Sequence, residues 1–261
     1  MNIAVIVPAS VSTSTPSNAA ERPFLTATWS NLILLTYAVP PSILRPLLPP
    51  LCELDMIGGD AFVSLVAFDF LDTRVFGRHW PGHVSFPEIN LRFYVRQGSD
   101  RGVVFVREFV PRRMISMIAW LLYNEPYRGV PMRSTVERDQ ETIALTHRVR
   151  LRGRSYGLRV EAGTSTRQPD PAEREHFFKE HQWGYGTTRS GKLLRYRVDH
   201  PTWLVHPVQQ VALDWDWARI YGERWAFLQE REPDSRIVAV GSAVAVYPKG
   251  SMVPPLIENG A

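Results

Sequence analysis

Residues 86–98, FPEINLRFYVRQG, carry polar groups of three different chemistries at every second position. Glu88, Asn90 and Arg92 alternate with apolar residues, and a period of two is typical of a strand with one buried face. A carboxylate, an amide and a guanidinium held together can bind an anionic ligand or exchange protons with it. The pattern predicts that this polar face lines an enclosed site. The alternative is a solvated face on which Glu88 has no role.

Two consecutive arginines form a second candidate. Arg112 and Arg113 follow Pro111, which suits the first position of a helix predicted over 111–125. The helix dipole opposes positive charges at a helix N-terminus, by about 0.3–1 kcal/mol each when they are exposed. A bound anion would compensate, because guanidinia and helical N–H groups together bind carboxylate or phosphate. A solvated first turn remains the alternative.

Residues 180–207 gather aromatic and histidine side chains within a short span, from EHQWGYG to HPTWLVHP. Aromatic walls with a few polar groups are typical of small-molecule pockets. We therefore expect Tyr185, His200 and Trp203 to lie around one cavity. Core packing with incidental histidines is the alternative.

Two short motifs resemble known active sites but lack the required context. GRSYG, residues 153–157, matches the pattern around an esterase serine, which needs a strand, a sharp turn and then a helix. LRVEAG follows Ser155 and alternates like a strand, so we predict a hairpin turn and keep a hydrolase only as a weaker alternative. GTTRSGK, residues 186–192, has Leu193 where a phosphate-binding loop needs Ser or Thr.

The histidine spacing does not assemble a metal site. Pro81 separates His79 from His83, and His176 and His181 are five residues apart, on different faces of a helix. We predict no metal and no cofactor, although distant residues could still form a metal site.

Arginines at positions 148, 150 and 152 lie on one face of a predicted strand. No aromatic side chains interleave with them, so we predict a solvated face and no nucleic-acid binding. No stretch of about 18 apolar residues is present, which predicts no membrane span. Cys52 is the only cysteine, which excludes an intramolecular disulfide and fits the cytoplasm. A homo-oligomer remains open.

The elements that must position these groups are mostly strands. Strands are expected at 24–39, 60–77, 86–97, 103–110, 132–163, 192–198 and 236–248. Helical segments are expected at 40–50, 111–125, 170–181 and 217–229, with Asp170 and Glu173 forming a capping box. With 261 residues, we predict a flexible tail over 1–22, one domain over 23–248 and a tail over 249–261. Many strands without βαβ alternation predict an α+β, mainly β fold: an antiparallel β-barrel or strongly curved sheet flanked by a few helices.

The chain resembles the YqjF-like family of uncharacterised bacterial proteins in the order and spacing of four motifs: FPEINLRFYV, a G-V-x-F strand, EHxWGY and HPxW. The resemblance extends from about residue 29 to 247. That family is similar in fold to acetoacetate decarboxylase, which implies an antiparallel β-barrel flanked by helices. In the decarboxylase a glutamate lies on a comparable strand, and Glu88 is similar to it.

The resemblance also bears on mechanism. The decarboxylase has its reactive lysine in a G-x-P-K-K run, and the comparable run here, VREFVPRRM, has Arg112 and Arg113 instead. Arginine cannot supply the neutral amine that a Schiff base requires. We predict a pocket for a small carboxylate or keto acid without a Schiff base, in which Glu88 and Arg113 act on the ligand. Turnover would be of a lyase or hydratase type, and a non-enzymatic sensor or scaffold is the alternative.

Overall fold

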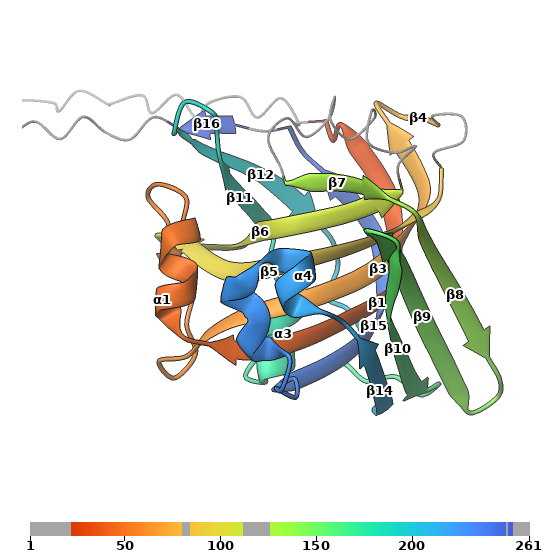
Figure 1. Cartoon of the computed structure of the whole chain (residues 1–261). Helices are drawn as coiled ribbons and strands as arrows, with labels where there is room; N and C mark the ends of the chain where they lie inside the picture. Colours follow the sequence, from red (N-terminus) through yellow and green to blue (C-terminus); the bar gives the residue numbers. More distant parts are fainter. Residues whose placement is uncertain (1–21, 80–83, 112–125, 249, 253–261) are drawn as a thin grey trace, which may run out of the picture.

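A strongly curved sheet of 12 strands dominates the part of the chain that the computed structural model describes, residues 22–79, 84–111, 126–248 and 250–252 (Figure 1). Its main path, in order of pairing, is β13 (Val205–His206), β15 (Ser235–Val246), β1 (Leu25–Val39), β3 (Ala61–Val75), β5 (Phe86–Gln97), β6 (Asp100–Pro111), β11 (Trp183–Thr187), β12 (Leu193–Asp199) and β16 (Gly250–Met252). Attached to it are β2 (Glu53–Leu54), β4 (Arg78–His79) and β7 (Tyr127–Val130). The sheet curls until β12 also pairs with β15. The predicted barrel or strongly curved sheet is confirmed.

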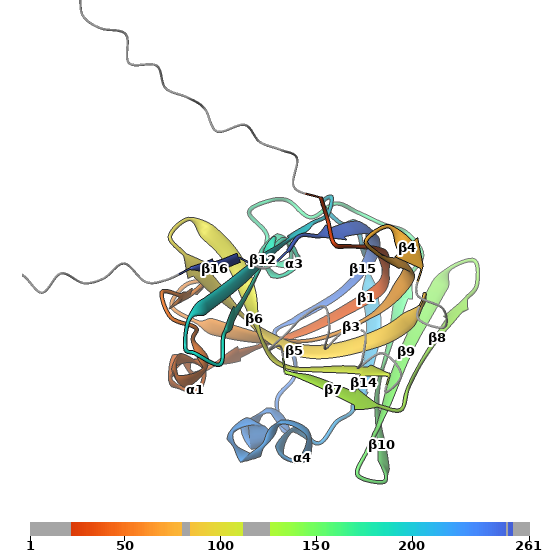
Figure 2. The same ribbon diagram turned by 90° about the horizontal axis from the view of Figure 1, so that it is seen from above.

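A second sheet covers the outer face of the curl (Figure 2). It consists of β14 (Val208–Asp214), β10 (Arg154–Gly163), β9 (Thr142–Leu151) and β8 (Met132–Arg138). One apolar cluster fills the space between the two sheets, and another lies inside the curl. Strand β5 serves both, because Ile89 and Leu91 face the outer cluster while Tyr94 faces the inner one.

The helical segments are short: α1 (Pro41–Leu44), η1 (Arg45–Leu47), α3 (Arg174–Lys179), α4 (Trp217–Tyr221) and η3 (Glu223–Leu228). The helix predicted over 217–229 breaks at Gly222, where a φ of 107° is incompatible with helix. The helix predicted over 170–181 is shorter than expected. The predicted capping box does not cap it: the helix begins at Arg174 with Glu173 as its N-cap, and only the bond from the backbone N–H of Asp170 to Oε1 of Glu173, at 3.0 Å, matches the prediction. The predicted helix at 111–125, with Arg112 and Arg113, lies outside the described residues.

Both rejected motifs form hairpins. Ser155 lies on β10, just after the turn that joins β9 to β10, so no helix follows it. GTTRSGK forms the end of β11 and the turn into β12. In the described ranges, no helix is both long and apolar enough to cross a membrane.

Candidate functional site

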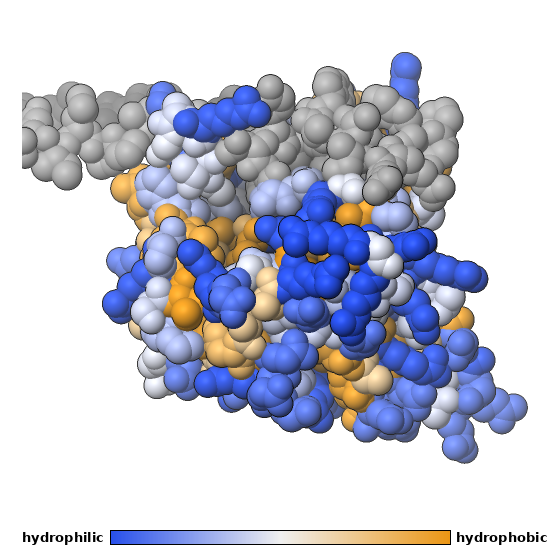
Figure 3. All heavy atoms as spheres, viewed as in Figure 1, coloured by the Kyte–Doolittle hydropathy of each residue, from blue (hydrophilic) through white to orange (hydrophobic). Residues whose placement is uncertain are grey.

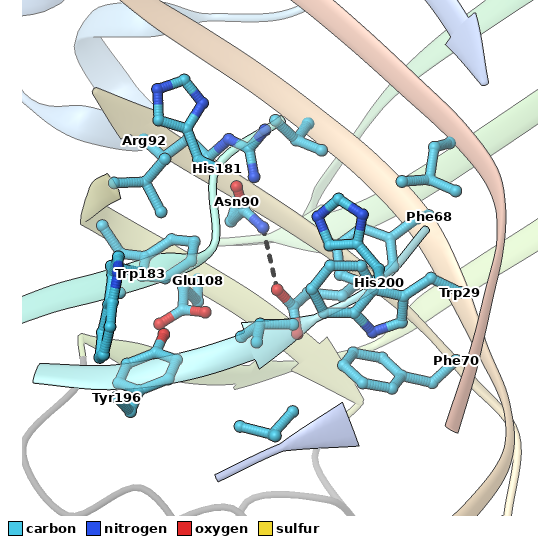
Figure 4. A pocket seen from close by; sticks show the side chains of 18 of the residues that line it. Trp29, Phe68, Phe70, Asn90, Arg92, Glu108, His181, Trp183, Tyr196 and His200 are labelled. Carbon is cyan, nitrogen blue, oxygen red and sulfur yellow. Dashed lines mark hydrogen bonds between the residues drawn. The ribbon is translucent and has the colours of Figure 1, made fainter. Parts of the chain in front are cut away.

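A cavity lies inside the curled sheet, between β5, β6, β11 and β12 and the segment that follows α3 (Figure 4). The cavity has a volume of about 80 Å³, counted as the space in which the centre of a water molecule can lie. A single water needs about 10–15 Å³ by the same measure, so the cavity can hold several waters or one small organic molecule.

Strand β5 supplies the polar floor of the cavity. Glu88 is 3% exposed and Asn90 is 2% exposed, and Nδ2 of Asn90 donates a hydrogen bond to Oε1 of Glu88 at 2.9 Å. Arg92 lines the same cavity, and its Nη2 donates to the carbonyl of Phe178 at 3.1 Å. Glu88 and Asn90 are therefore enclosed, and Arg92 is partly buried at the same cavity.

A second buried carboxylate comes from a β-bulge in β6. Arg92 pairs with Phe105 and Leu91 pairs with Arg107, so Val106 is an extra residue without a partner on β5. The bulge shifts the alternation of β6 and turns Glu108 into the cavity, opposite Asn90. Glu108 is 1% exposed. Simple alternation from Val103 places Glu108 on the outer face, and the sequence contains no signal for the bulge.

Lys179 contributes an ammonium group to the wall of the cavity. It is the last residue of α3, its side chain is fully buried, and its Nζ forms an ion pair with Oε1 of Glu180. The same oxygen accepts a hydrogen bond from the backbone N–H of Trp203 at 3.3 Å. The sequence has only three lysines, but we did not predict that this one faces the site.

His181, the residue next to this pair, is neutral at ordinary pH. Its burial lowers the pKa to about 4, because desolvation disfavours the charged imidazolium. The Asp55 carboxylate, 3.8 Å from Nε2, acts in the opposite direction but more weakly. The guanidinia of Arg92 and Arg101 lower the pKa further. The cavity thus contains an imidazole that can donate or accept a proton.

Aromatic rings form the opposite wall. His200 and Trp203 stack with ring centroids 4.2 Å apart, and Trp29 lies 6.0 Å from Trp203. Nε1 of Trp203 donates to the hydroxyl of Ser242 at 2.8 Å, which fixes the indole. The structure therefore places His200 and Trp203 at the same cavity as Glu88, Asn90 and Arg92.

The structure places Tyr185 outside the cavity, contrary to our expectation. Its ring is buried in the outer apolar cluster, and its hydroxyl donates to the carbonyl of Asp100 at 3.3 Å. Gly184, the preceding residue of β11, lines the cavity, and neighbouring side chains of a strand point to opposite faces. The cavity has Tyr196 instead, which pairs with Gly184 across β11 and β12. In Figure 4 the Tyr196 and Glu108 side chains point toward one another.

Among the described residues, no cluster of three or more His, Cys, Asp or Glu side chains could hold a metal ion. Arg112 and Arg113, the remaining predicted site residues, lie outside the described part of the chain, and their role stays a prediction.

Comparisons with known proteins agree with the fold. Residues 26–244 match the DUF2071 family, described as "Uncharacterized conserved protein (COG2071)". The chain is 27% identical over 183 residues to the uncharacterized protein YqjF of Bacillus subtilis (strain 168), covering 68% of this chain and 73% of that protein.

Solved structures with similar folds share little sequence. An acetoacetate decarboxylase-like enzyme from Sphingomonas wittichii RW1 matches with a TM-score of 0.60 and 12% identity, over 94% of this chain and 98% of that one. The enduracididine biosynthesis enzyme MppR, complexed with pyruvate, matches with a TM-score of 0.62 and 13% identity, over 94% and 98% of the two chains. Identities this low establish the fold alone. The chain therefore belongs to the DUF2071 family and has an acetoacetate decarboxylase-like fold, as its resemblance to the YqjF-like proteins predicted.

Proposed function

We propose that the cavity inside the curled sheet binds a small carboxylic or keto acid. The observation that supports this proposal best is the convergence of cationic, acidic and neutral polar groups on one small enclosed space. Arg92 and Lys179 supply positive charge, whereas Glu88 and Glu108 supply buried carboxylates. Such a set can hold an anionic group at one end of a ligand and exchange protons with the other end.

The volume and the aromatic wall restrict the ligand. A space of about 80 Å³ for the centres of water-sized molecules suits a compound of a few heavy atoms rather than an extended cofactor. The stacked pair of His200 and Trp203 offers a flat apolar surface for the carbon skeleton. The similarity in fold to MppR, whose structure was determined with pyruvate, supports a small keto acid as the ligand class.

Within this proposal the ligand is bound without a Schiff base. Lys179 is the described lysine nearest to the ligand space, and its ammonium is paired with the Glu180 carboxylate. An Nζ atom engaged in that ion pair is held by the carboxylate and not directed at a carbonyl carbon. Lys179 then acts as a fixed cation that orients the acid, together with Arg92. The predicted contribution of Arg113 awaits the same test as that of Glu88.

A thermal-shift screen against small organic acids, including pyruvate and acetoacetate, tests the proposal. A ligand present at ten times its dissociation constant stabilises the folded state by about 1.4 kcal/mol, which such a screen detects. We expect at least one acid to raise the melting temperature of the parent protein and not that of the Glu88→Gln variant. A screen in which no acid stabilises the parent would contradict the proposal.

A further inference from the structure

Four arginines gather on the outer face of the molecule around the short helix α4. They belong to four different elements and are remote in sequence: Arg107 on β6, Arg128 on β7, Arg152 in the β9–β10 turn and Arg219 on α4. Figure 3 shows a strongly hydrophilic area over β7 and the adjoining end of the β9–β10 hairpin, beside α4. We refer to these four residues as the α4 arginine cluster.

The same bulge that turns Glu108 inward turns Arg107 outward. After the extra residue Val106, Arg107 pairs with Leu91 of the outer apolar face. Arg128 pairs with Phe109, which follows Arg107 by two residues and therefore lies on the same face of β6. The register of the sheet thus places Arg107 and Arg128 side by side.

Helix α4 links the remaining two arginines to this pair. Nη1 of Arg107 donates to the carbonyl of Ile220, and its guanidinium lies 6.0 Å from the ring centroid of Tyr221. From the same helix, Nη2 of Arg219 donates to the carbonyl of Arg152 at 3.5 Å. Arg152 itself has a φ of 46°, a left-handed conformation that a hairpin turn requires and that is uncommon for arginine.

The charges of the cluster are not compensated by the described part of the protein. No Asp or Glu among the described residues forms an ion pair with any of its four members. Burial lowers the pKa of Arg107, Tyr221 acts in the opposite direction, and the charges of Arg128 and Arg152 lower it further. Placing like charges together destabilises a fold. A bound anion would reverse that effect.

We propose that the α4 arginine cluster binds a phosphoryl dianion, either inorganic phosphate or the phosphate group of a monoester. Each guanidinium presents five N–H donors in a rigid fork. Of the five donors of Arg107, one forms a hydrogen bond with a described acceptor, the carbonyl of Ile220. Several such forks around one short helix can match the charge and the oxygen atoms of a phosphoryl group. A monocarboxylate offers one charge and two oxygens, which is a poorer match.

This site is separate from the cavity. Glu88, Asn90 and Arg92 face the inside of the curled sheet, whereas Arg107 and Arg128 pair with residues of its outer face. The proposal therefore does not depend on the proposed binding of a small acid. The two ligands can be tested on the same protein.

Calorimetric titration with inorganic phosphate and with phenyl phosphate, at constant ionic strength set by chloride, tests the proposal. We expect saturable binding of at least one of them by the parent protein, weakened at least tenfold in Arg128→Gln and in Arg152→Gln. Arg148→Gln serves as the matched control, because Arg148 is also exposed and faces another arginine, Arg133, but lies outside the cluster. Its affinity should remain within about twofold of the parent.

Thermal melting adds a second test, because phosphate would not raise the melting temperature if the arginines were merely a solvated surface. Without phosphate, Arg128→Gln should melt at or above the temperature of the parent, because one repulsive charge has been removed. With phosphate, the parent should gain stability and the variant should not. Equal affinity for both probes would indicate recognition of the phosphoryl group alone, and tighter binding of phenyl phosphate would assign the site to monoesters. Phosphate that stabilises no more than chloride, or equal losses in all three variants, would overturn the proposal.

Discussion

At the scale of single residues, the pair of Lys179 and Glu180 bears on the chemistry proposed for the cavity, because it involves the buried amine. A lysine beside a space that holds a keto acid could form a Schiff base, whereas here Nζ is engaged in the ion pair with Glu180. In the proposed function, Lys179 contributes charge and orientation instead of a covalent bond. Breaking this pair would leave one charge buried without a partner, so Lys179 is a poor position for a simple alanine test.

Borohydride trapping tests the absence of a Schiff base directly. Incubation of the parent protein with acetoacetate and borohydride should leave no adduct on Lys179, Lys192 or Lys249, because the Nζ atom of Lys179 is engaged in the ion pair with Glu180. Peptide mass spectrometry reads the outcome. A borohydride-dependent mass increase on the peptide that contains Lys179 would show that the amine reacts.

His181 should make the stability of the fold depend on pH. Its pKa is about 4 in the folded state, below the ordinary value of 6.5, so the unfolded chain binds more protons between these two values. The stability contributed by the neutral imidazole is present above pH 6.5 and is lost as the pH falls toward 4. The stability lost between pH 6.5 and pH 4 amounts to about 3 kcal/mol.

Urea unfolding of the parent and of His181→Gln between pH 7 and pH 4.5 checks this expectation. The free energy of unfolding of the parent should fall more steeply than that of the variant, by about 2–3 kcal/mol over this range. Other titrating groups contribute to both proteins and cancel in the difference. Parallel curves would mean that His181 is not a buried neutral imidazole.

At the scale of elements, the alternation of side chains along β11 explains why Tyr185 does not line the cavity. In the sequence WGYG, residues 183–186, the aromatic residue at 185 looked like a pocket wall, but it packs into the outer core while Gly184 faces the cavity. A methyl group at position 184 would overlap the ring of Tyr196. Glycine is therefore required so that Tyr196 can lie flat against β11 and line the cavity.

Gly184→Ala should destabilise the fold by about 1–3 kcal/mol, as overpacking does in other tightly packed interiors. Chemical denaturation measures this loss. Because the overlap is with Tyr196, the same substitution should cost much less in a Tyr196→Ala background. Equal costs in both backgrounds would place the source of the strain elsewhere.

Most strands could be predicted from the sequence, because the alternation of polar and apolar residues and the enrichment in β-branched residues are local features of a strand. Glu88, Asn90 and Arg92 were assigned to one enclosed face on that basis, and the structure puts all three at the cavity. Glu108 could not be found in this way, since the bulge at Val106 depends on the pairing of β6 with β5. Lys179 could not be found either, because its position depends on how the end of α3 packs inside the curl.

At the scale of the whole molecule, the two proposed sites lie on the two faces of one curled sheet. The inner face combines acidic and basic groups around a small cavity, and the outer face carries the α4 arginine cluster. Since the two groups of residues lie on opposite faces of the sheet, their effects on binding should be additive. Arg128→Gln should leave the affinity for a small acid within about twofold, and Glu88→Gln should do the same for phosphate. Strong coupling between the two titrations would contradict this separation.

The most direct test is a calorimetric titration of the cavity with the acid that the thermal-shift screen identifies, starting with pyruvate. We expect Glu88→Gln to abolish binding, because the variant removes a buried carboxyl group that lines the cavity and is held by Asn90. Arg148→Ala, on the solvated strand face, should bind within about twofold of the parent, or roughly 0.4 kcal/mol. If Glu88→Gln binds the acid as tightly as the parent does, the polar face of β5 is not the ligand site.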